Sequence, residues 1–407
     1  MSTERENILF VDRAGYDFYR LPTGEPVLDP ERYRVTLVTP NEFSGQARYG
    51  ECAEVLCLDV NDHTMLDALI EALHRRRPFD HLLACSEGLL LPMASLRERL
   101  GIPGPTPEEV LPYRDKSIMK ASARRAGLPV ADWLPVDRAA DAHDLLATYG
   151  TVVIKPRAGF GSAGIHIVSA ADELRALDDD PALDLTNHQA EQFIDAPMVH
   201  IDAIVRGGKP HTVVPSRYLT STLSFTRGLP VLSVTVDEPR LVAACETLLA
   251  QVAGAFGAKD SVLHLEAFAM DDDHLVFSEV ACRPGGSNLQ ALVAAVSGVS
   301  LHEAAVRLSL GEAPTTTYPV RGRAAGHAIL YGRNGLVTAV DDQAVPAEWI
   351  VERRLLVAPD GRFRPVGMVG GGVAEYVLLG NSTEEVSYRM RFVADNVTIS
   401  YEDGNEV

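Results

Sequence analysis

The sequence of 407 residues lacks a basic surplus, long apolar runs and paired cysteines, and each absence excludes a class of protein. Its net charge of −19 argues against a nucleic-acid or anionic-membrane surface, which needs basic patches. The sequence contains no run of about 18 apolar residues, so no membrane-spanning helix is predicted. The first ten residues lack the features of a signal peptide. The five cysteines include no C-x-x-C pair, which argues against a disulfide framework or a zinc site. We therefore expect a cytoplasmic protein.

The composition is that of a globular protein, with 46% hydrophobic and 23% charged residues, and the length favours two or three domains. The first 110 residues or so alternate strand and helix patterns. Strands are expected at 7–12, 33–40 and 79–86, and an amphipathic helix at 63–77. This order predicts an α/β layer with a mostly parallel sheet.

A segment with four prolines and two glycines, Gly101 to Asp115, is expected to lead into a second domain. The helix after it should begin at Asp115 or Ser117 and end before Gly127. Further helices are expected near 171–177, 239–258, 288–298 and 300–312. After "APTTTYP" (313–319) the chain is strand-rich with one late helix at 382–396.

The stretch "VVIKPRAGFGSAGIHIV" (152–168) contains a G-x-G-x-x-G pattern at Gly159, Gly161 and Gly164. A Rossmann site needs a helix after the glycines, but a β-like segment follows here. A Walker loop needs a G-K-[ST] ending, and a kinase needs H-R-D and D-F-G; both are absent. What remains is a β-flap over phosphates with Lys155 on its first strand, or a plain glycine-rich hairpin with a surface lysine.

A second motif, "SVLHLEAFAMDDDHLVFSEVACRPGGS" (261–287), reads as a β-hairpin. A two-residue turn at Asp272 and Asp273 would set Glu266 opposite Glu279, and Phe268 opposite Phe277. Two carboxylates so placed repel each other unless a cation lies between them, and Mg²⁺ prefers such oxygen ligands. The alternative is a longer turn that directs one glutamate to solvent.

Four residues beyond Glu279, Arg283 precedes Pro284-Gly285-Gly286 and a predicted helix. An arginine beside a glycine turn and a helix N-terminus favours anion binding. Carboxylates for a metal and an anion site on one hairpin predict phosphoryl transfer at this place.

In this order the motifs resemble the ATP-grasp superfamily of carboxylate–amine ligases, and in particular its L-amino acid ligase and natural-product peptide ligase branch. The resemblance runs from about Asp115 to Gly286 through "DK", "VIKPRAGFGSAGIHIV", "EQFIDAP", "HLEAF" and "EVACRPGG". It implies an ATP-grasp fold of α/β and α+β parts. The implied domains are an N-terminal α/β domain (1–110), an ATP-grasp domain (111–312) and a strand-rich C-terminal subdomain (313–407). The ATP-grasp domain would comprise a flap lobe (about 115–190), a hinge (191–194) and a metal-site lobe (195–312).

The resemblance implies that a substrate carboxylate attacks the γ-phosphate of ATP, and that an amine then displaces phosphate from the acyl phosphate to give an amide. Arg283 and Lys155 would be the catalytic residues, and Glu266 and Glu279 would hold Mg²⁺ or Mn²⁺. The ATP-binding residues would be Lys116, Lys155, Gly159, Phe160, Gly161, Ser162, Gly164, Glu191, Gln192, Phe193 and Ile194.

Candidate substrate residues are few: Arg217, Gly285 and Gly286, of which Arg217 reads equally well as a surface arginine. The expected partners are a small-molecule acid, such as an amino acid, and an amine. The family also allows a donor tethered to a carrier protein, and a homodimer.

Two positions depart from the family pattern. Ala281 stands where many relatives have a metal-binding Asn, and Met198 where an acidic residue usually binds the ribose. Two alternatives therefore stay open: another carboxylate activator of the superfamily, such as a biotin-carboxylase-like enzyme, and a nucleotide-binding protein without turnover.

Overall fold

The computed structural model describes residues 5–314, 319–358 and 361–402. Its N-terminal part is a four-stranded sheet in the order β3-β2-β1-β4, and all of its neighbouring strands are parallel. The predicted parallel α/β layer is therefore confirmed. The elements are β1 (Glu6–Val11), β2 (Tyr33–Thr39), β3 (Glu54–Cys57), β4 (His81–Leu83), α1 (His63–Arg76) and α2 (Leu90–Leu100).

The proline-rich segment contains the short helix α3 (Pro107–Val110) and leads to α4 (Lys116–Arg125). Asp115 caps α4, because its carboxylate accepts hydrogen bonds from the backbone amides of Ser117 and Ile118. Gly127 follows the helix with a φ of 78°, a conformation that glycine adopts without strain. Both predicted ends of this helix are confirmed.

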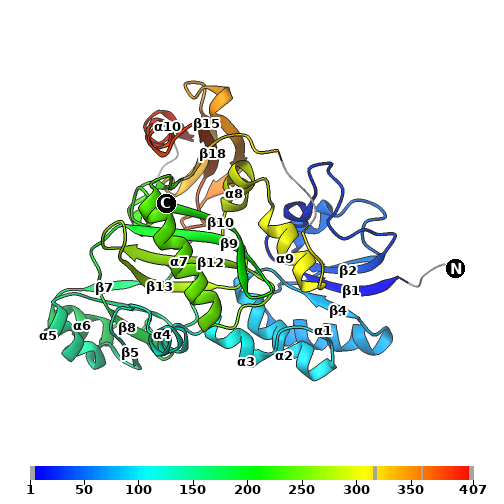
Figure 1. Cartoon of the computed structure of the whole chain (residues 1–407), viewed down its shortest axis with the longest axis horizontal. Helices are drawn as coiled ribbons and strands as arrows, with labels where there is room; N and C mark the ends of the chain where they lie inside the picture. Colours follow the sequence, from blue (N-terminus) through cyan, green and yellow to red (C-terminus); the bar gives the residue numbers. More distant parts are fainter. Residues whose placement is uncertain (1–4, 315–318, 359–360, 403–407) are drawn as a thin grey trace.

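A small lobe follows α4 and projects from one side of the molecule (Figure 1). Its four strands lie in the order β5-β8-β6-β7, with β6 and β7 antiparallel on either side of the glycine loop. The elements are β5 (Trp133–Val136), β6 (Val152–Pro156), β7 (His166–Val168), β8 (His188–Gln192), α5 (His143–Tyr149) and α6 (Ala171–Asp178).

The largest sheet has eight strands in the order β13-β12-β9-β10-β11-β14-β18-β16. It joins strands from both sides of residue 313, so it runs across the predicted domain boundary there, and the segment 313–319 lies partly outside the described residues. The strands are β9 (Met198–Arg206), β10 (Lys209–Tyr218), β11 (Val231–Thr235), β12 (Ser261–Ala269), β13 (Leu275–Ala281), β14 (Ala324–Leu330), β16 (Ile350–Leu355) and β18 (Ala374–Gly380).

Helices cover both faces of this sheet. On one face α7 (Pro239–Ala255) and α4 pack against β9, β12 and β13, and α10 (Thr383–Asn396) packs against β14 and β18. On the other face α8 (Leu289–Ser297) and α9 (Leu301–Ser309) pack against Ile204, Val262 and Val377. A small sheet, β17-β15-β19, completes the C-terminal part, with strands β15 (Gly335–Asp341), β17 (Gly361–Phe363) and β19 (Thr398–Tyr401).

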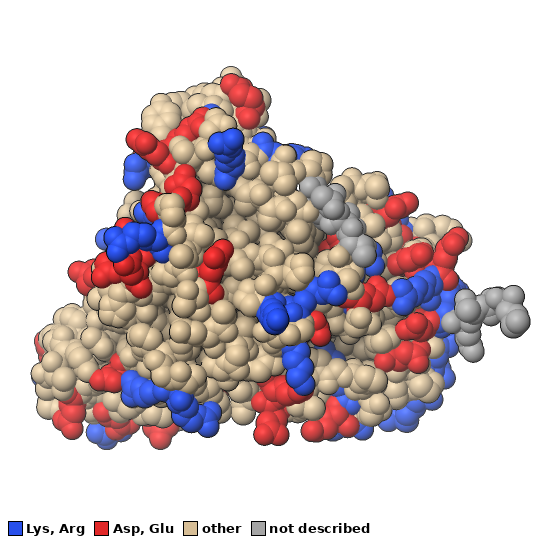
Figure 2. Space-filling view, viewed as in Figure 1, with Lys and Arg blue, Asp and Glu red and all other residues tan. Residues whose placement is uncertain are grey.

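Acidic and basic side chains are interspersed around the rim of the face seen in Figure 2, and the middle of that face is mostly uncharged. Among the described residues, no single helix is long and apolar enough to cross a membrane. The helices α8 and α9 pass that test only as a pair, by length and composition, across a bend of 94°.

Candidate active site

The β12–β13 hairpin places Glu266 directly opposite Glu279, as predicted, but by a different route. The expected two-residue turn is wrong, because the strands are joined by residues 270–274, with Asp271 accepting hydrogen bonds from the amides of Asp273 and His274. Phe268 therefore pairs with Val276, and Phe277 with Ala267, so the predicted Phe268–Phe277 pair is also wrong.

A β-bulge restores the register of the two glutamates. The pairing shifts by one residue between Glu266 and Ala267, which leaves Ser278 as the extra residue of β13. A bulge turns a side chain toward a new direction and is common beside active sites. Here it returns Glu279 to the face of the sheet that carries Glu266.

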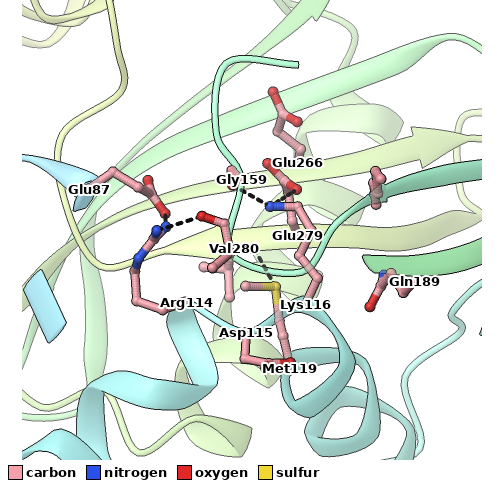
Figure 3. A network of polar contacts seen from close by, with 12 residues as sticks. Glu87, Arg114, Asp115, Lys116, Met119, Gly159, Gln189, Glu266, Glu279 and Val280 are labelled. Carbon is pink, nitrogen blue, oxygen red and sulfur yellow. Dashed lines mark hydrogen bonds and ion pairs between the residues drawn. The ribbon is translucent and has the colours of Figure 1, made fainter. Parts of the chain in front are cut away.

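Cations and a hydroxyl group surround the two carboxylates. Lys116 Nζ lies 3.1 Å from Glu279 Oε2 and donates to the carbonyl of Gly159 at 2.8 Å, and Figure 3 shows these contacts beside Glu266. The Tyr218 hydroxyl donates to Glu266 Oε1 at 2.9 Å. Burial would raise the pKa of Glu279, but Lys116 and Lys155 lower it below its usual range. An ionised oxygen donor facing a second carboxylate fits the ligand preference of Mg²⁺.

A second charged group joins the small lobe to α4. Lys155 Nζ lies 2.7 Å from Glu191 Oε1, and Lys120 Nζ lies 3.1 Å from Glu191 Oε2. The side-chain amide of Gln189 also donates to Glu191 Oε1 at 2.6 Å. Burial opposes ionisation of Glu191, yet the two lysines lower its pKa to about 2. Its carboxylate is thus occupied by protein groups, and an adenine at this hinge would have to use other groups, such as the backbone beyond it.

These groups border a cleft of about 540 Å³ between the small lobe and the large sheet. Most of the predicted nucleotide and metal residues line it: Lys116, Lys155, Gly159, Phe160, Ser162, Glu191, Gln192, Phe193, Ile194, Glu266 and Glu279. Apolar contacts come from Val153, Ile167, Met198 and Phe268. A cleft with an apolar part and a charged end suits a purine base joined to phosphates.

The predicted flap has the expected strand–loop–strand form and lies against two distant segments. The guanidinium of Arg13 lies 5.1 Å from the centre of the Phe160 ring, and the amide of Val369 donates to the carbonyl of Gly161 at 2.9 Å. Gly161 and Gly164 have φ values of 63° and 68°, which suit glycine. They do not line the cleft but shape the loop that does.

The predicted anion loop, Arg283 to Gly286, lies beside the cleft and not in its lining. Gly285 packs so closely that a Cβ on it would lie 2.6 Å from Asp202 Oδ1 and 3.1 Å from His264 Nδ1. Asp202 is fully buried, and its carboxylate oxygens accept hydrogen bonds from Nδ1 of His200 and Nδ1 of His264, each at 2.9 Å. This group lies next to Glu266, since His264 Nε2 is 3.7 Å from Glu266 Oε1.

Arg217 does not join the site. His200 is paired with both Glu266 and Ser216, so these three residues share one face of the sheet. Arg217, the next residue, therefore points to the opposite face. There it forms an ion pair with Glu238 in a separate surface pocket.

Several residues of this region were missed from the sequence. Glu87 binds Arg283 and Arg114, Lys120 binds Glu191, and Tyr218 binds Glu266. Glu87 lies just beyond the carboxyl end of β4, where ligands of parallel sheets usually bind, so its position in "CSEG" was a usable signal. Lys120 and Tyr218 lie inside regular elements, Arg114 lies in the turn before α4, and none of the three has a local signature.

Comparison with known proteins agrees with this arrangement. The ATP-grasp N-terminal domain family matches residues 33–104. The chain is 28% identical over 287 residues to the L-arginine-specific L-amino acid ligase of Bacillus subtilis, covering 69% of each chain.

Two solved structures are similar in fold. The L-amino acid ligase of Bacillus licheniformis has a TM-score of 0.79 at 19% identity, covering 98% of this chain and 100% of that chain. The biotin carboxylase domain of Hydrogenobacter thermophilus 2-oxoglutarate carboxylase, solved with MgADP and bicarbonate, has a TM-score of 0.72 at 16% identity, covering 98% and 91%.

The fold and the cleft are those of ATP-grasp proteins, and the predicted ATP-grasp fold is confirmed. The sequence relative supports the predicted class, that of the carboxylate–amine ligases. Within this class the chain is similar to L-amino acid ligases.

Proposed function

We propose that the protein joins an amino acid, or another small acid, to an amine through an acyl phosphate, with release of ADP and phosphate. The observation that carries this proposal is the opposed pair Glu266–Glu279, which borders the same cleft as Lys116, Lys155 and the flap. An amino acid is proposed as the acid because the Bacillus subtilis relative is named for that substrate class.

In the proposed reaction ATP occupies the cleft between the small lobe and the large sheet. Its base would lie against the apolar side chains Ile167, Met198 and Phe268, with the hinge backbone at 192–194 beside it. Met198 stands where relatives bind the ribose through an acidic residue, and Asp195, which also lines the cleft, is proposed to take that role. Lys155 and Lys116 would offset the phosphate charge.

Glu266 and Glu279 are proposed to hold Mg²⁺ or Mn²⁺. When bound, the cation would neutralise charge on the phosphates during transfer. Because Ala281 offers no ligand atom on its side chain, the two carboxylates would supply the protein's share of the ligands. Arg283 is proposed to stabilise the acyl phosphate, and the closed flap would keep water from it.

The proposal is tested with Mg-ATP, hydroxylamine and each amino acid or common small acid in turn, with products identified by mass spectrometry. Hydroxylamine traps an acyl phosphate as a hydroxamate and replaces the unknown amine. We expect a hydroxamate with one class of acid, formed together with ADP. ATP turnover that needs bicarbonate and no amine would favour the biotin-carboxylase-like alternative, and tight ATP binding without turnover would contradict the proposal.

The Glu279→Gln variant tests the metal assignment. It removes one charge and keeps the shape, so we expect ADP formation to fall below about one hundredth of the wild-type rate, a loss of more than about 2.7 kcal/mol of transition-state stabilisation. Retained ADP formation in Glu279→Gln would contradict the assignment.

The domain bounds, a carrier-bound donor, a homodimer and the cytoplasmic location remain predictions.

A further inference from the structure

Glu87 lies at the meeting point of three segments that are far apart in the sequence. It begins the 3₁₀ helix η3 (Glu87–Leu89) of the N-terminal part and is 9% exposed. Arg114, from the segment before α4, and Arg283, from the segment after β13, both bind its carboxylate. Figure 3 shows Glu87 and Arg114 beside the strand that carries Glu279 and Val280.

The bonds of Arg283 leave one part of its guanidinium available. Its Nε donates to Glu87 Oε2 at 2.6 Å, and its Nη1 donates to the carbonyl of Pro284 at 2.6 Å. Within the described residues, no hydrogen bond is formed by its Nη2. The two bonds hold the guanidinium plane in one orientation, with Nη2 as the donor that remains for an anion.

Arg114 connects the same carboxylate to the flap. Its Nη1 binds Glu87, and its Nη2 donates to the carbonyl of Ala158 at 2.7 Å, one residue before Gly159. When the flap root moves, the carbonyl that holds Arg114 moves with it. The position of the flap is thus linked through Arg114 and Glu87 to the orientation of Arg283.

Glu87 remains a charged group in this arrangement. Burial would raise its pKa, but the neighbouring Arg283 and Arg114 lower it below its usual range. A carboxylate between two arginines forms strong, directional hydrogen bonds to both. A neutral amide of the same shape would leave both arginines without their counter-charge.

We propose that Glu87 is a positioning residue that orients Arg283 and couples this orientation to closure of the flap through Arg114. The inference rests on the proposed function, because Arg283 is taken to act on the acyl phosphate. Each carboxylate oxygen of Glu87 is bound by an arginine, so Glu87 acts through the arginines and not on the nucleotide.

A double-mutant cycle with Glu87→Gln and Arg283→Lys tests the proposal. We expect Glu87→Gln to lower the rate of hydroxamate formation about 10- to 100-fold, the scale seen for groups that orient a ligand-binding residue. The KM for ATP should change by less than about twofold. In the Arg283→Lys background, Glu87→Gln should lower this rate by less than about twofold, because the effects of groups that act through one another are not additive. A further 10- to 100-fold fall of the rate in that background would show that Glu87 acts independently of Arg283 and would overturn the proposal.

Two further measurements separate positioning from general damage. Glu303→Gln is the matched control, since Glu303 is 1% exposed and binds Arg307 at 2.8 Å on α9; it should leave the rate unchanged. The Nε–H signal of Arg283, in protein labelled with ¹⁵N-arginine and assigned by its absence in Arg283→Lys, reports the bond without turnover. We expect this signal to be protected from solvent exchange in the wild type and exposed in Glu87→Gln. An unchanged signal in Glu87→Gln would overturn the proposal. This result does not depend on turnover, whereas the absence of hydroxamate with the wild type would by itself reject the proposed function.

Discussion

Single atoms decide the geometry of the anion loop. Gly285 lies where any side chain would meet Asp202 and His264, and Asp202 is the buried acceptor that holds both histidines beside Glu266. The glycine at this position is therefore required by close approach, whereas its neighbour Gly286 has free space around it. The two adjacent glycines thus form a natural pair of test and control.

We expect Gly285→Ala to reduce the free energy of unfolding by about 1–3 kcal/mol, because its Cβ would lie 2.6 Å from Asp202 Oδ1. A shift of the loop by about 1 Å should also lower hydroxamate formation about a hundredfold. Chemical unfolding and the hydroxamate assay measure the two effects. Gly286→Ala, with nothing within 4 Å of its Cβ, should keep the wild-type free energy of unfolding, and an equal loss of stability in both variants would contradict this explanation.

Helices are joined to distant segments by a buried ion pair and by a contact between two rings. The helix α4 reaches β8 through Lys120, which is 0% exposed and lies 3.1 Å from Glu191. The helix α9 reaches the N-terminal part through His302, which stacks on Phe18 with ring centres 5.1 Å apart. Both contacts connect segments that the chain itself keeps far apart.

Lys120→Met should be strongly destabilising. It leaves Glu191 with one lysine fewer in a buried place, and breaking a buried ion pair costs about 3–5 kcal/mol. Urea unfolding measures the loss. The exposed Lys259→Met is the control and should stay within about 0.5 kcal/mol of the wild type. A comparably small effect of Lys120→Met would mean that Lys155 alone is sufficient for Glu191.

His302 should make the fold sensitive to acid. Burial, with Arg283 and Arg354 nearby, lowers its pKa from 6.5 to about 3. Between these values the unfolded chain binds a proton that the folded chain does not, so stability falls as pH drops below 6.5.

The variant His302→Phe removes this effect and keeps a ring against Phe18. Relative to the variant, the wild type should lose about 1.4 kcal/mol of unfolding free energy per pH unit below 6.5. Urea unfolding of both proteins at about pH 7 and pH 5 measures the difference. Parallel losses in the two proteins would contradict the assignment.

At the scale of the whole molecule, the flap brings three parts together. Phe160 lies under Arg13 of the N-terminal part, and Gly161 is hydrogen-bonded to Val369 in the C-terminal part. The "VGGGV" segment (369–373) therefore contacts the flap. The flap of the small lobe is thus held by the N-terminal and C-terminal parts together.

We expect Phe160→Ala to uncouple ATP use from product formation. Losing a cation–π contact worth about 0.5–2 kcal/mol should raise the ratio of ADP to hydroxamate by about 2- to 30-fold. The ratio is read from the two products in one assay. Phe193→Ala, which alters the hinge side of the same cleft, should change the KM for ATP and leave the ratio unchanged. An unchanged ratio in Phe160→Ala would contradict the role of the flap contact.

Local pattern was sufficient for much of this protein. The parallel N-terminal sheet, the caps of α4 and the strand–loop–strand form of the flap all follow from hydrophobic period, capping residues and glycines, which act within a few residues. The pairing of Glu266 with Glu279 was also predicted, although a longer turn and a compensating bulge at Ser278 produce it. Turn length and bulges depend on how both strands pack, so the sequence alone did not determine them.

Tertiary structure decided everything that joins distant segments. No local pattern relates Glu87 to Arg283, 196 residues away, or Lys120 to Glu191. The face on which Arg217 points depended on the register of β9 and β10, and the eight-stranded sheet joined strands across the predicted boundary at 313. The sequence by itself determined the class of chemistry, because motifs for phosphate and metal are short and local. The orientation of Arg283 and the closure of the flap were decided by the fold, because buried charges are positioned by partners that only packing brings together.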